Sequence, residues 1–182
     1  MKEKTLNITA YSTKSQIKYS QFMQLNDLVD NEEIDELFLQ NRILNIFFNL
    51  QPKDIRLIKQ KDIDSLLANI NYVINQPISE FSRLIEMDGV TYGFLPNFAD
   101  ITAGELIDID DCQERNDIIS LTSILYRPII GKVNKLGEYQ IEEYKGYTDN
   151  FKNVSLDVVE GYLSFFEQSF QILNHSTTPF IK

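Results

Sequence analysis

The chain has 182 residues, of which 43% are hydrophobic and 12% aromatic, so it can bury a core and is too apolar to be a disordered chain. Its 27 acidic and 17 basic residues give a formal net charge of −10, which disfavours nucleic acid as a partner. The single cysteine excludes a disulfide within the chain and fits a reducing compartment. Residues 1–11 lack the apolar core of a secretory signal, and no apolar run could span a membrane, so we expect a cytosolic protein with no membrane partner.

The first predicted elements are a short strand and a helix. Apolar residues alternate with polar ones at Leu6, Ile8 and Ala10, which is the period of a half-buried strand and predicts one over residues 5–11. Over residues 16–29 the apolar positions recur at the longer intervals of a helix. We therefore expect an N-terminal strand followed by a helix.

Two further helices are predicted in the first half of the chain. Between residues 34 and 48 apolar side chains recur three, four and seven positions apart, and Asp30 or Asn31 precedes them as an N-cap. Pro52 is expected to end this helix, because proline cannot continue one. Residues 62–75 carry a second apolar stripe of the same period and are followed by another proline.

The pattern changes near the middle of the chain, where a β-hairpin is predicted. Residues 83–87 and 90–95 flank Asp88 and Gly89, a pair that suits the positive φ angles of a type I′ turn. Such a turn joins two antiparallel strands. We expect these two segments to pair directly across it.

Helices return after the hairpin. Thr102 and Glu105 have the spacing of a capping box, which predicts that a helix begins there. A further helix is predicted over residues 116–126 and should stop before Pro128. The last helix is expected over residues 156–173, where the apolar stripe is broad enough to face a core on more than one side.

Residues 129–147 connect the last two helices. They contain three glycines, a pattern typical of a second short hairpin or of an extended loop. Together the elements predict an α+β fold, mainly α: a helical domain with one or two short β-hairpins. A chain of this length is expected to form a single domain over residues 1–182, and if it has two lobes we expect them to be 1–76 and 77–182.

Few residues in the sequence could carry acid–base, nucleophilic or metal chemistry. His175 is the sole histidine and follows the last predicted helix, where a solvated side chain or a helix-end cation is expected. Cys112 follows acidic residues, which raise the pKa of a thiol and disfavour a nucleophilic role. The acidic run from Asp108 opens like a calcium loop, but Gln113 and Ile119 stand where that loop needs glycine and glutamate. We expect no bound metal.

No known catalytic or cofactor-binding motif is present. The place of the sole histidine, His175, near the C-terminus after the last predicted helix disfavours a catalytic triad, and a single imidazole excludes a zinc site that needs two. The glycines are too scattered for a phosphate-binding loop, and neither GxxxxGK[ST] nor GxGxxG occurs. We therefore predict a protein that is not an enzyme and has no cofactor, with no catalytic, cofactor-binding or metal-binding residues.

Three segments in the central third of the chain form an ordered set of motifs. They read YGFLPNFADITAGELIDID over residues 92–110, LYRPI over 125–129 and YQIEEY over 139–144. This order resembles a group of largely uncharacterised tailed-bacteriophage proteins. The resemblance implies a role in tail assembly or virion morphogenesis and no enzymatic activity. It brings no established chemical role for any of these residues.

The glycine between two aromatic residues, beside a proline, marks residues 92–96 as a place of close backbone approach or as an exposed ledge. One hypothesis is a partner surface in which this ledge and the acidic helix after it surround an apolar anchor with carboxylates. Its residues would be Tyr92, Phe94, Pro96, Asp108, Asp110 and Asp111. The alternative is that Tyr92 and Phe94 only pack the hairpin onto the helices. Arg127 is expected to hold a neighbouring acid such as Asp108 or Asp111.

Several functions are compatible with these features. The leading hypothesis is a non-enzymatic bacteriophage protein that acts through protein–protein contacts in virion assembly, as a tail-assembly chaperone does, with a phage structural protein as its partner in the host cytoplasm. One alternative is a structural component of the virion, such as a ring protein of the head-to-tail connector. Another is an acidic inhibitor of host defence that mimics DNA, since 27 carboxylates could imitate phosphate charges. The sequence leaves the oligomeric state open.

Overall fold

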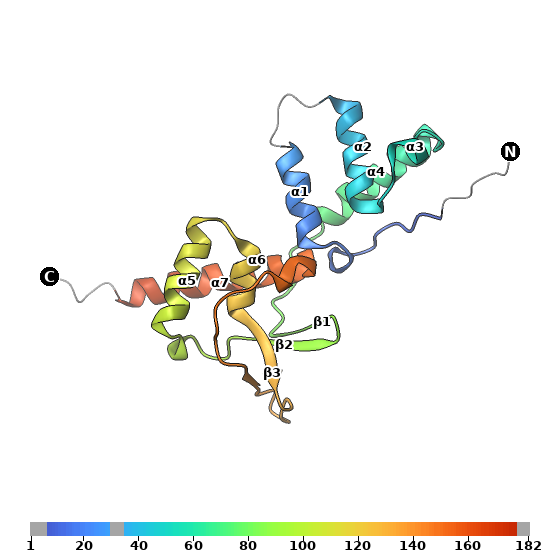
Figure 1. The fold of residues 1–182 in the computed structure, drawn as a ribbon. Coiled ribbons are helices and arrows are strands. Elements are labelled where there is room, and N and C mark those ends of the chain that lie inside the picture. Colours follow the sequence, from blue (N-terminus) through green and yellow to red (C-terminus); the bar gives the residue numbers. More distant parts are fainter. Residues whose placement is uncertain (1–6, 30–34, 178–182) are drawn as a thin grey trace. The chain divides into compact units, whose positions relative to one another are not determined.

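The computed structural model describes residues 7–29 and 35–177, with the side chains of the last helix as far as Phe166. The chain divides into two compact units, Met1–Pro77 (unit 1) and Ile78–Lys182 (unit 2) (Figure 1). The predicted lobe boundary after residue 76 lies beside this division. Helices dominate and one small antiparallel sheet is present, which confirms the predicted α+β, mainly α, fold class. Among the described residues, no helix combines the length and the apolar character needed to cross a membrane.

Unit 1 is helical in its described part. After a 3₁₀ turn at Lys14–Gln16 it contains α1 Tyr19–Val29, α2 Glu36–Phe48, α3 Pro52–Ile55 and α4 Gln60–Ile74. Leu44, Leu50, Ile55 and Ile63 form a buried apolar cluster at its centre. These residues come from α2, the turn after it, α3 and α4, so three helices share one core.

The prediction of an N-terminal strand over residues 5–11 is wrong, because the described residues 7–11 belong to no sheet. Residues 5 and 6 lie outside the described part. The side chain of Asn69 takes the place of a strand partner. It accepts a hydrogen bond from the Tyr11 N–H (2.9 Å) and donates one to the Tyr11 C=O (2.8 Å). The Tyr11 ring packs edge-on against Phe47, with centroids 6.2 Å apart. These contacts of Tyr11 attach the segment to helices α2 and α4, and no described strand pairs with it.

The helices predicted over residues 16–29 and 34–48 are present with later starts. The first is preceded by the 3₁₀ turn and begins as α1. The predicted caps of the second, Asp30 and Asn31, lie outside the described residues. Asp35 is the N-cap of α2, and its carboxylate accepts a hydrogen bond from the Phe38 N–H (3.1 Å).

The prediction that Pro52 ends α2 is wrong. The helix already ends at Phe48, because Asn49 adopts the left-handed conformation with a φ of 53°. Pro52 instead begins α3, where its missing N–H costs nothing because the first helical positions have no intrahelical acceptor. The helix predicted over residues 62–75 is confirmed as α4.

Unit 2 combines a four-stranded antiparallel sheet, in the order β1-β2-β3-β4, with three α-helices in its described part. Its elements are β1 Leu84–Met87, β2 Val90–Phe94, α5 Ala103–Glu114, α6 Ile118–Leu125, β3 Tyr126–Ile130, β4 Gln140–Ile141 and α7 Leu156–Thr177, with 3₁₀ turns at Phe98–Asp100 and Asn150–Asn153. Aromatic rings hold the sheet to α7. The Phe94 ring lies 5.1 Å from that of Tyr126 and 6.5 Å from that of Tyr162.

The strands β1 and β2 form the predicted hairpin. Met87 pairs with Val90 directly across the turn. Asp88 and Gly89 have φ angles of 52° and 78°, and positive values at both positions are what a type I′ turn requires. The predicted hairpin and its turn are therefore confirmed.

The second predicted hairpin is also present, as β3 and β4. The helix α6 begins at Ile118, later than predicted, because Asn116 has a φ of 53°. It passes directly into β3, so Pro128 lies within a strand. Proline has no N–H to donate to its partner Glu142, whose own N–H donates to the Pro128 C=O (2.9 Å). The regular ladder accordingly ends at Ile141.

The last helix is longer than predicted. It continues to Thr177, so His175 lies within the helix and not after it, and its side chain is outside the described part. Gly161 allows α7 to approach the chain before β1 closely. A Cβ at this position would lie 3.1 Å from the carbonyl oxygen of Glu80.

Replacing Gly89 with valine is expected to lower the free energy of unfolding by about 1–3 kcal/mol, because a β-branched residue is strained at a positive φ angle. Gly104→Ala is the matched control, since Gly104 is helical and an added Cβ would meet only the Thr102 hydroxyl, at 4.0 Å. The control should unfold at the same or slightly higher urea concentration than the wild type. Equal stability of the G89V variant and the wild type would contradict the turn geometry.

Candidate functional site

The three sequence motifs meet at one open cleft of unit 2, here named the motif cleft. Its volume is about 790 Å³. One part of its lining comes from six residues between Leu95 and Glu105, and another comes from all six residues of the segment 139–144. Arg127 and Ile130 of β3 complete it. Segments far apart in the sequence thus build a single site.

A buried ion pair joins α5 to β3 at the motif cleft. The side chains of Glu105 and Arg127 are only 4% and 12% exposed, and Arg127 Nη2 lies 2.9 Å from Glu105 Oε1. The second carboxylate oxygen accepts hydrogen bonds from the Thr102 N–H (2.8 Å) and from the Thr102 hydroxyl (2.7 Å). The hydroxyl oxygen accepts in turn from the Glu105 N–H (3.2 Å). The predicted capping box is confirmed, and its glutamate is also the counter-charge of Arg127.

The prediction that Arg127 holds a neighbouring acid is confirmed, but the acid is Glu105, nearer the start of α5, and neither Asp108 nor Asp111. Asp108 instead accepts a hydrogen bond from the Tyr144 hydroxyl (2.6 Å). The guanidinium of Arg127 lies over the Tyr144 ring, 5.8 Å from its centroid. Burial, together with the hydrogen bond to Asp108, raises the pKa of Tyr144 well above its usual value. Tyr144 therefore connects the Asp108 carboxylate and the Arg127 guanidinium to the 139–144 segment.

Tyr139 explains the glycine of the YGF motif. A Cβ on Gly93 would lie 2.4 Å from the Tyr139 ring, so only glycine leaves room for this contact. The Tyr139 hydroxyl donates a hydrogen bond to the Phe94 C=O (2.8 Å), and burial raises its pKa. Of the two alternatives predicted for this glycine, the close backbone approach is the one that the structure contains.

The predicted ledge residues lie in three different environments. Phe94 is 2% exposed and belongs to the core, so the packing alternative holds for this residue and it cannot be a surface anchor in this conformation. Tyr92 is half-buried, with its ring 5.0 Å from that of Phe151. Pro96 is exposed and lines the motif cleft.

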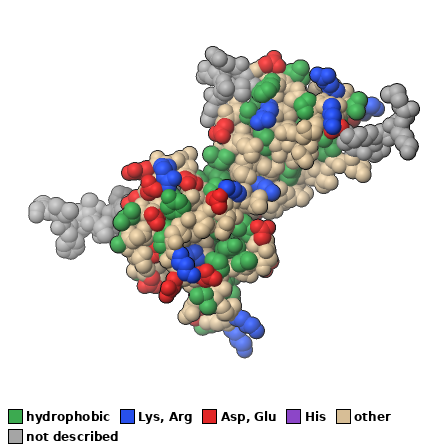
Figure 2. Space-filling model, viewed as in Figure 1, with side chains coloured by type: hydrophobic (Ala, Val, Ile, Leu, Met, Phe, Trp, Pro, Cys, Tyr) green, Lys and Arg blue, Asp and Glu red, His purple; other side chains and the backbone are tan. Residues whose placement is uncertain are grey.

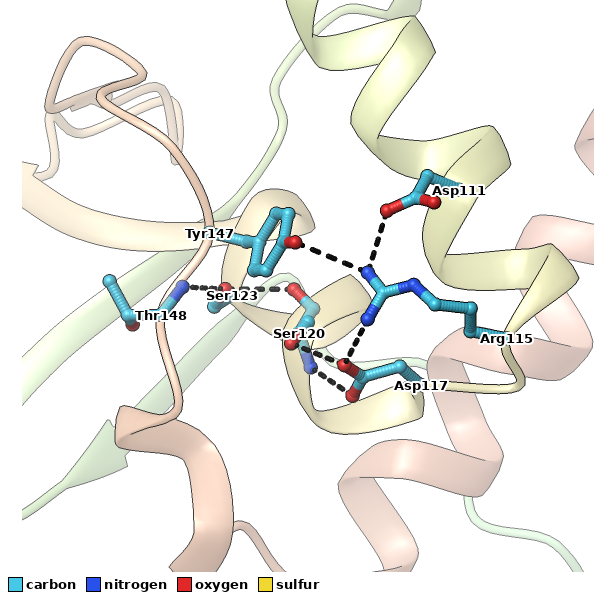
Figure 3. A network of polar contacts seen from close by, with 7 residues as sticks. All are labelled: Asp111, Arg115, Asp117, Ser120, Ser123, Tyr147 and Thr148. Atoms are coloured by element: carbon cyan, nitrogen blue, oxygen red, sulfur yellow. Dashed lines mark hydrogen bonds and ion pairs between the residues drawn. The ribbon is translucent and has the colours of Figure 1, made fainter.

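Asp111, another predicted partner residue, belongs to a polar network at the end of α5 (Figure 3). Arg115 donates hydrogen bonds to the Asp111 carboxylate (2.7 Å) and to the Tyr147 hydroxyl (3.2 Å). It also lies 3.7 Å from the carboxylate of Asp117. Ion pairs this exposed add little stability, but they keep the Asp111 carboxylate paired within the chain.

The same network continues into α6 and the loop that follows β4. Asp117 caps α6 by accepting a hydrogen bond from the Ser120 N–H (3.0 Å). The Ser123 hydroxyl donates to the Ser120 C=O (2.7 Å) and accepts from the Thr148 N–H (2.8 Å). These bonds fix the loop between β4 and α7 against α6 (Figure 3).

The remaining residues of the acidic helix differ in accessibility. Asp110 is exposed, and Figure 2 shows acidic side chains among hydrophobic ones on the visible face of unit 2. Cys112 is fully buried, and burial and nearby carboxylates, first Asp117, raise the pKa of its thiol. The predicted direction of this shift is confirmed, with burial as the larger cause.

The motif cleft is acidic and partly apolar. Its only basic lining residue, Arg127, is neutralised by Glu105, whereas the exposed Asp100, Glu142 and Glu143 have no ion pair among the described residues. Apolar lining comes from Leu95, Pro96, Ile130 and Ile141. In the described part of the chain, no three His, Cys, Asp or Glu side chains gather as a metal site would require. The cleft therefore suits a ligand with basic and apolar groups.

Most residues of the motif cleft were absent from the predicted site. The signal that was available is the charge and tyrosine content of the LYRPI and YQIEEY motifs, which include Arg127, Glu143 and Tyr144. What the sequence does not contain is the strand register that brings residues 139–144 beside residues 95–105. Only Pro96 is common to the predicted and the observed site.

No protein-family model, no curated protein sequence and no solved structure significantly matches this chain.

The substitution Arg127→Met is expected to lower the free energy of unfolding by about 3–5 kcal/mol, because the buried Glu105 carboxylate loses its counter-charge. The double variant R127M/E105Q should recover part of this loss, since it leaves no unpaired buried charge. Urea denaturation of the wild type, both single variants and the double variant gives the coupling energy. Arg115→Met, in an exposed ion pair, is the control and should change stability little. Strictly additive losses at residues 127 and 105 would contradict a coupled pair.

Alkaline pH should destabilise the fold partly through Tyr144. An unfolded tyrosine ionises near pH ~10, whereas the folded Tyr144, with its raised pKa, keeps its proton. Above this pH the folded state binds more protons than the unfolded state, so the free energy of unfolding falls as pH rises. Tyr144→Phe is expected to make this fall shallower in denaturation series from about pH 9 to pH 11. The exposed Tyr72→Phe serves as control, and equal slopes for the Y144F variant and the wild type would refute the assignment.

Proposed function

We propose that this chain is a non-enzymatic protein that binds another protein through the motif cleft during the assembly of a bacteriophage virion. The observation that carries the proposal is the convergence of the three motifs on one cleft. Its buried charged groups, Glu105 and Arg127, pair with each other, and Asp108 is held by Tyr144. These groups hold the lining segments together and are not poised to react with a substrate.

The chemistry of the motif cleft supports a protein as partner. Its exposed carboxylates lie beside apolar lining, a combination that suits a protein segment in which basic side chains accompany apolar ones. A large acidic excess over the whole chain, with a formal charge of −10, would speed the approach of a basic partner. The same excess disfavours nucleic acid as the ligand.

The order of the motifs supports the biological setting. It resembles tailed-bacteriophage proteins placed among tail-assembly or morphogenesis functions, and all three motifs contribute residues to the cleft. The partner we propose is a phage structural protein that is bound before it enters the particle, as a tail-assembly chaperone would bind it.

The proposal is tested by reversing charge in the cleft. A tagged protein carrying Glu142→Lys and Glu143→Lys, expressed in phage-infected cells, is expected to capture at least about tenfold less of any phage structural protein than the wild type does, because like charges then repel a basic partner. Quantitative mass spectrometry of the captured proteins measures this loss. The matched control is Glu86→Lys with Glu114→Lys, two exposed residues outside the cleft lining that give the same change in net charge.

Two outcomes would count against this proposal. Undiminished capture by the cleft variant would place the binding surface elsewhere. Stoichiometric presence of the protein in purified virions would make it a virion component and not a chaperone.

A further inference from the structure

We infer that the motif cleft binds its partner by strand addition: an extended segment of the partner, in which basic and apolar residues alternate, pairs with the free edge of β4. This inference rests on the proposed function and specifies the kind of segment that the cleft accepts. It is carried by the backbone geometry of β4 and by the chemistry of the cleft lining.

The strand β4 is the last strand of the sheet, so one of its edges has no neighbouring strand within residues 7–29 and 35–177. The Glu142 N–H donates to the Pro128 C=O of β3 (2.9 Å). Hydrogen-bonding groups alternate in direction along an antiparallel strand, so Gln140 and Glu142 face β3 while the N–H and C=O groups of Ile141 and Glu143 point to the open edge. No hydrogen bond within the described part of the chain engages the backbone of Glu143.

The strand β4 and the residues on either side of it line the motif cleft. Six consecutive residues, 139–144, contribute to the lining, which is the length over which an added strand forms several backbone hydrogen bonds. Exposed strand edges are templates for pairing with another chain unless the fold covers or blunts them. The cleft between the segments 95–105 and 139–144 has a volume of about 790 Å³, so there is room for a further segment beside β4.

The charges and apolar side chains of the cleft lining determine which side chains an added segment should carry. Asp100, Glu142 and Glu143 are exposed carboxylates without a described counter-charge. Apolar contact comes from Leu95, Pro96, Ile130 and Ile141. Successive side chains of a strand point to opposite faces, so alternation of basic and apolar residues can satisfy both kinds of lining at once.

The experiment uses the full chain and three synthetic peptides as probes. The first alternates lysine and valine, the second has the same sequence with every backbone amide N-methylated, and the third carries glutamate in place of lysine. Fluorescence anisotropy is expected to show binding of the first peptide and at least about tenfold weaker binding of the other two, because they lack the backbone donors or the complementary charge. On saturation with the first peptide, hydrogen exchange should slow at the Ile141 and Glu143 amides.

Two variants at one position separate backbone pairing from charge. Glu143→Gln removes only the carboxylate and should weaken binding of the lysine–valine peptide by about 2–5-fold. Glu143→Pro also removes the outward N–H, without touching a bond to β3, and should weaken it about fivefold further. Matching melting curves of the two variants establish that both are folded.

Equal affinities of the two variants, or equal binding of the N-methylated peptide, would overturn strand addition and indicate an electrostatic contact only. Failure of this inference is distinct from failure of the proposed function. If no peptide pairs with β4 while the double charge reversal still abolishes capture of structural proteins, the cleft binds its partner in another way. If the peptide pairs with β4 but the charge reversal leaves capture unchanged, the proposed function fails at this site.

Discussion

The ion pair between Glu105 and Arg127 is the constraint on which much of unit 2 depends. Moving two charges out of water is costly, and the cost is offset only when each charge meets its partner and further hydrogen bonds in good geometry. Thr102 supplies those bonds to Glu105, and the Tyr144 ring covers Arg127. The start of α5, the position of β3 and the path of the 139–144 segment must therefore agree with one another, which makes the pair a determinant of one specific arrangement more than a source of stability.

The carboxylates of unit 2 fall into two groups that differ in what they contact. Some carboxylates act within the fold: Glu105 and Asp117 cap helices, and Asp108 and Asp111 receive hydrogen bonds from a tyrosine and an arginine. Others, such as Glu143, stay exposed at the cleft without a described counter-charge. A net charge alone does not separate these groups, because a carboxylate is free for a partner only when the fold has not already engaged it.

How well the sequence predicts a feature of this fold depends on how local the residues are that determine it. The Asp88-Gly89 turn and the capping box at Thr102 were predicted correctly, because a few adjacent residues determine their geometry. The sequence predicts that Arg127 holds an acid but not which one, since several acids of α5 are equivalent in sequence and only the packing of helix against strand chooses among them. The prediction of an N-terminal strand failed for a related reason. The Asn69 side chain, which takes the place of a strand partner for Tyr11, lies 58 residues away from it in the sequence.

The direct passage of α6 into β3 has a mechanical consequence. Leu125 is the last helical residue and Tyr126 the first of the strand, so no flexible connection separates them. The buried Tyr126 ring lies 5.8 Å from that of Tyr162, and its hydroxyl donates to the Ser82 C=O, which pins the junction at two points. Because no loop lies between α6 and β3, a rotation of β3 would have to displace α6 as well.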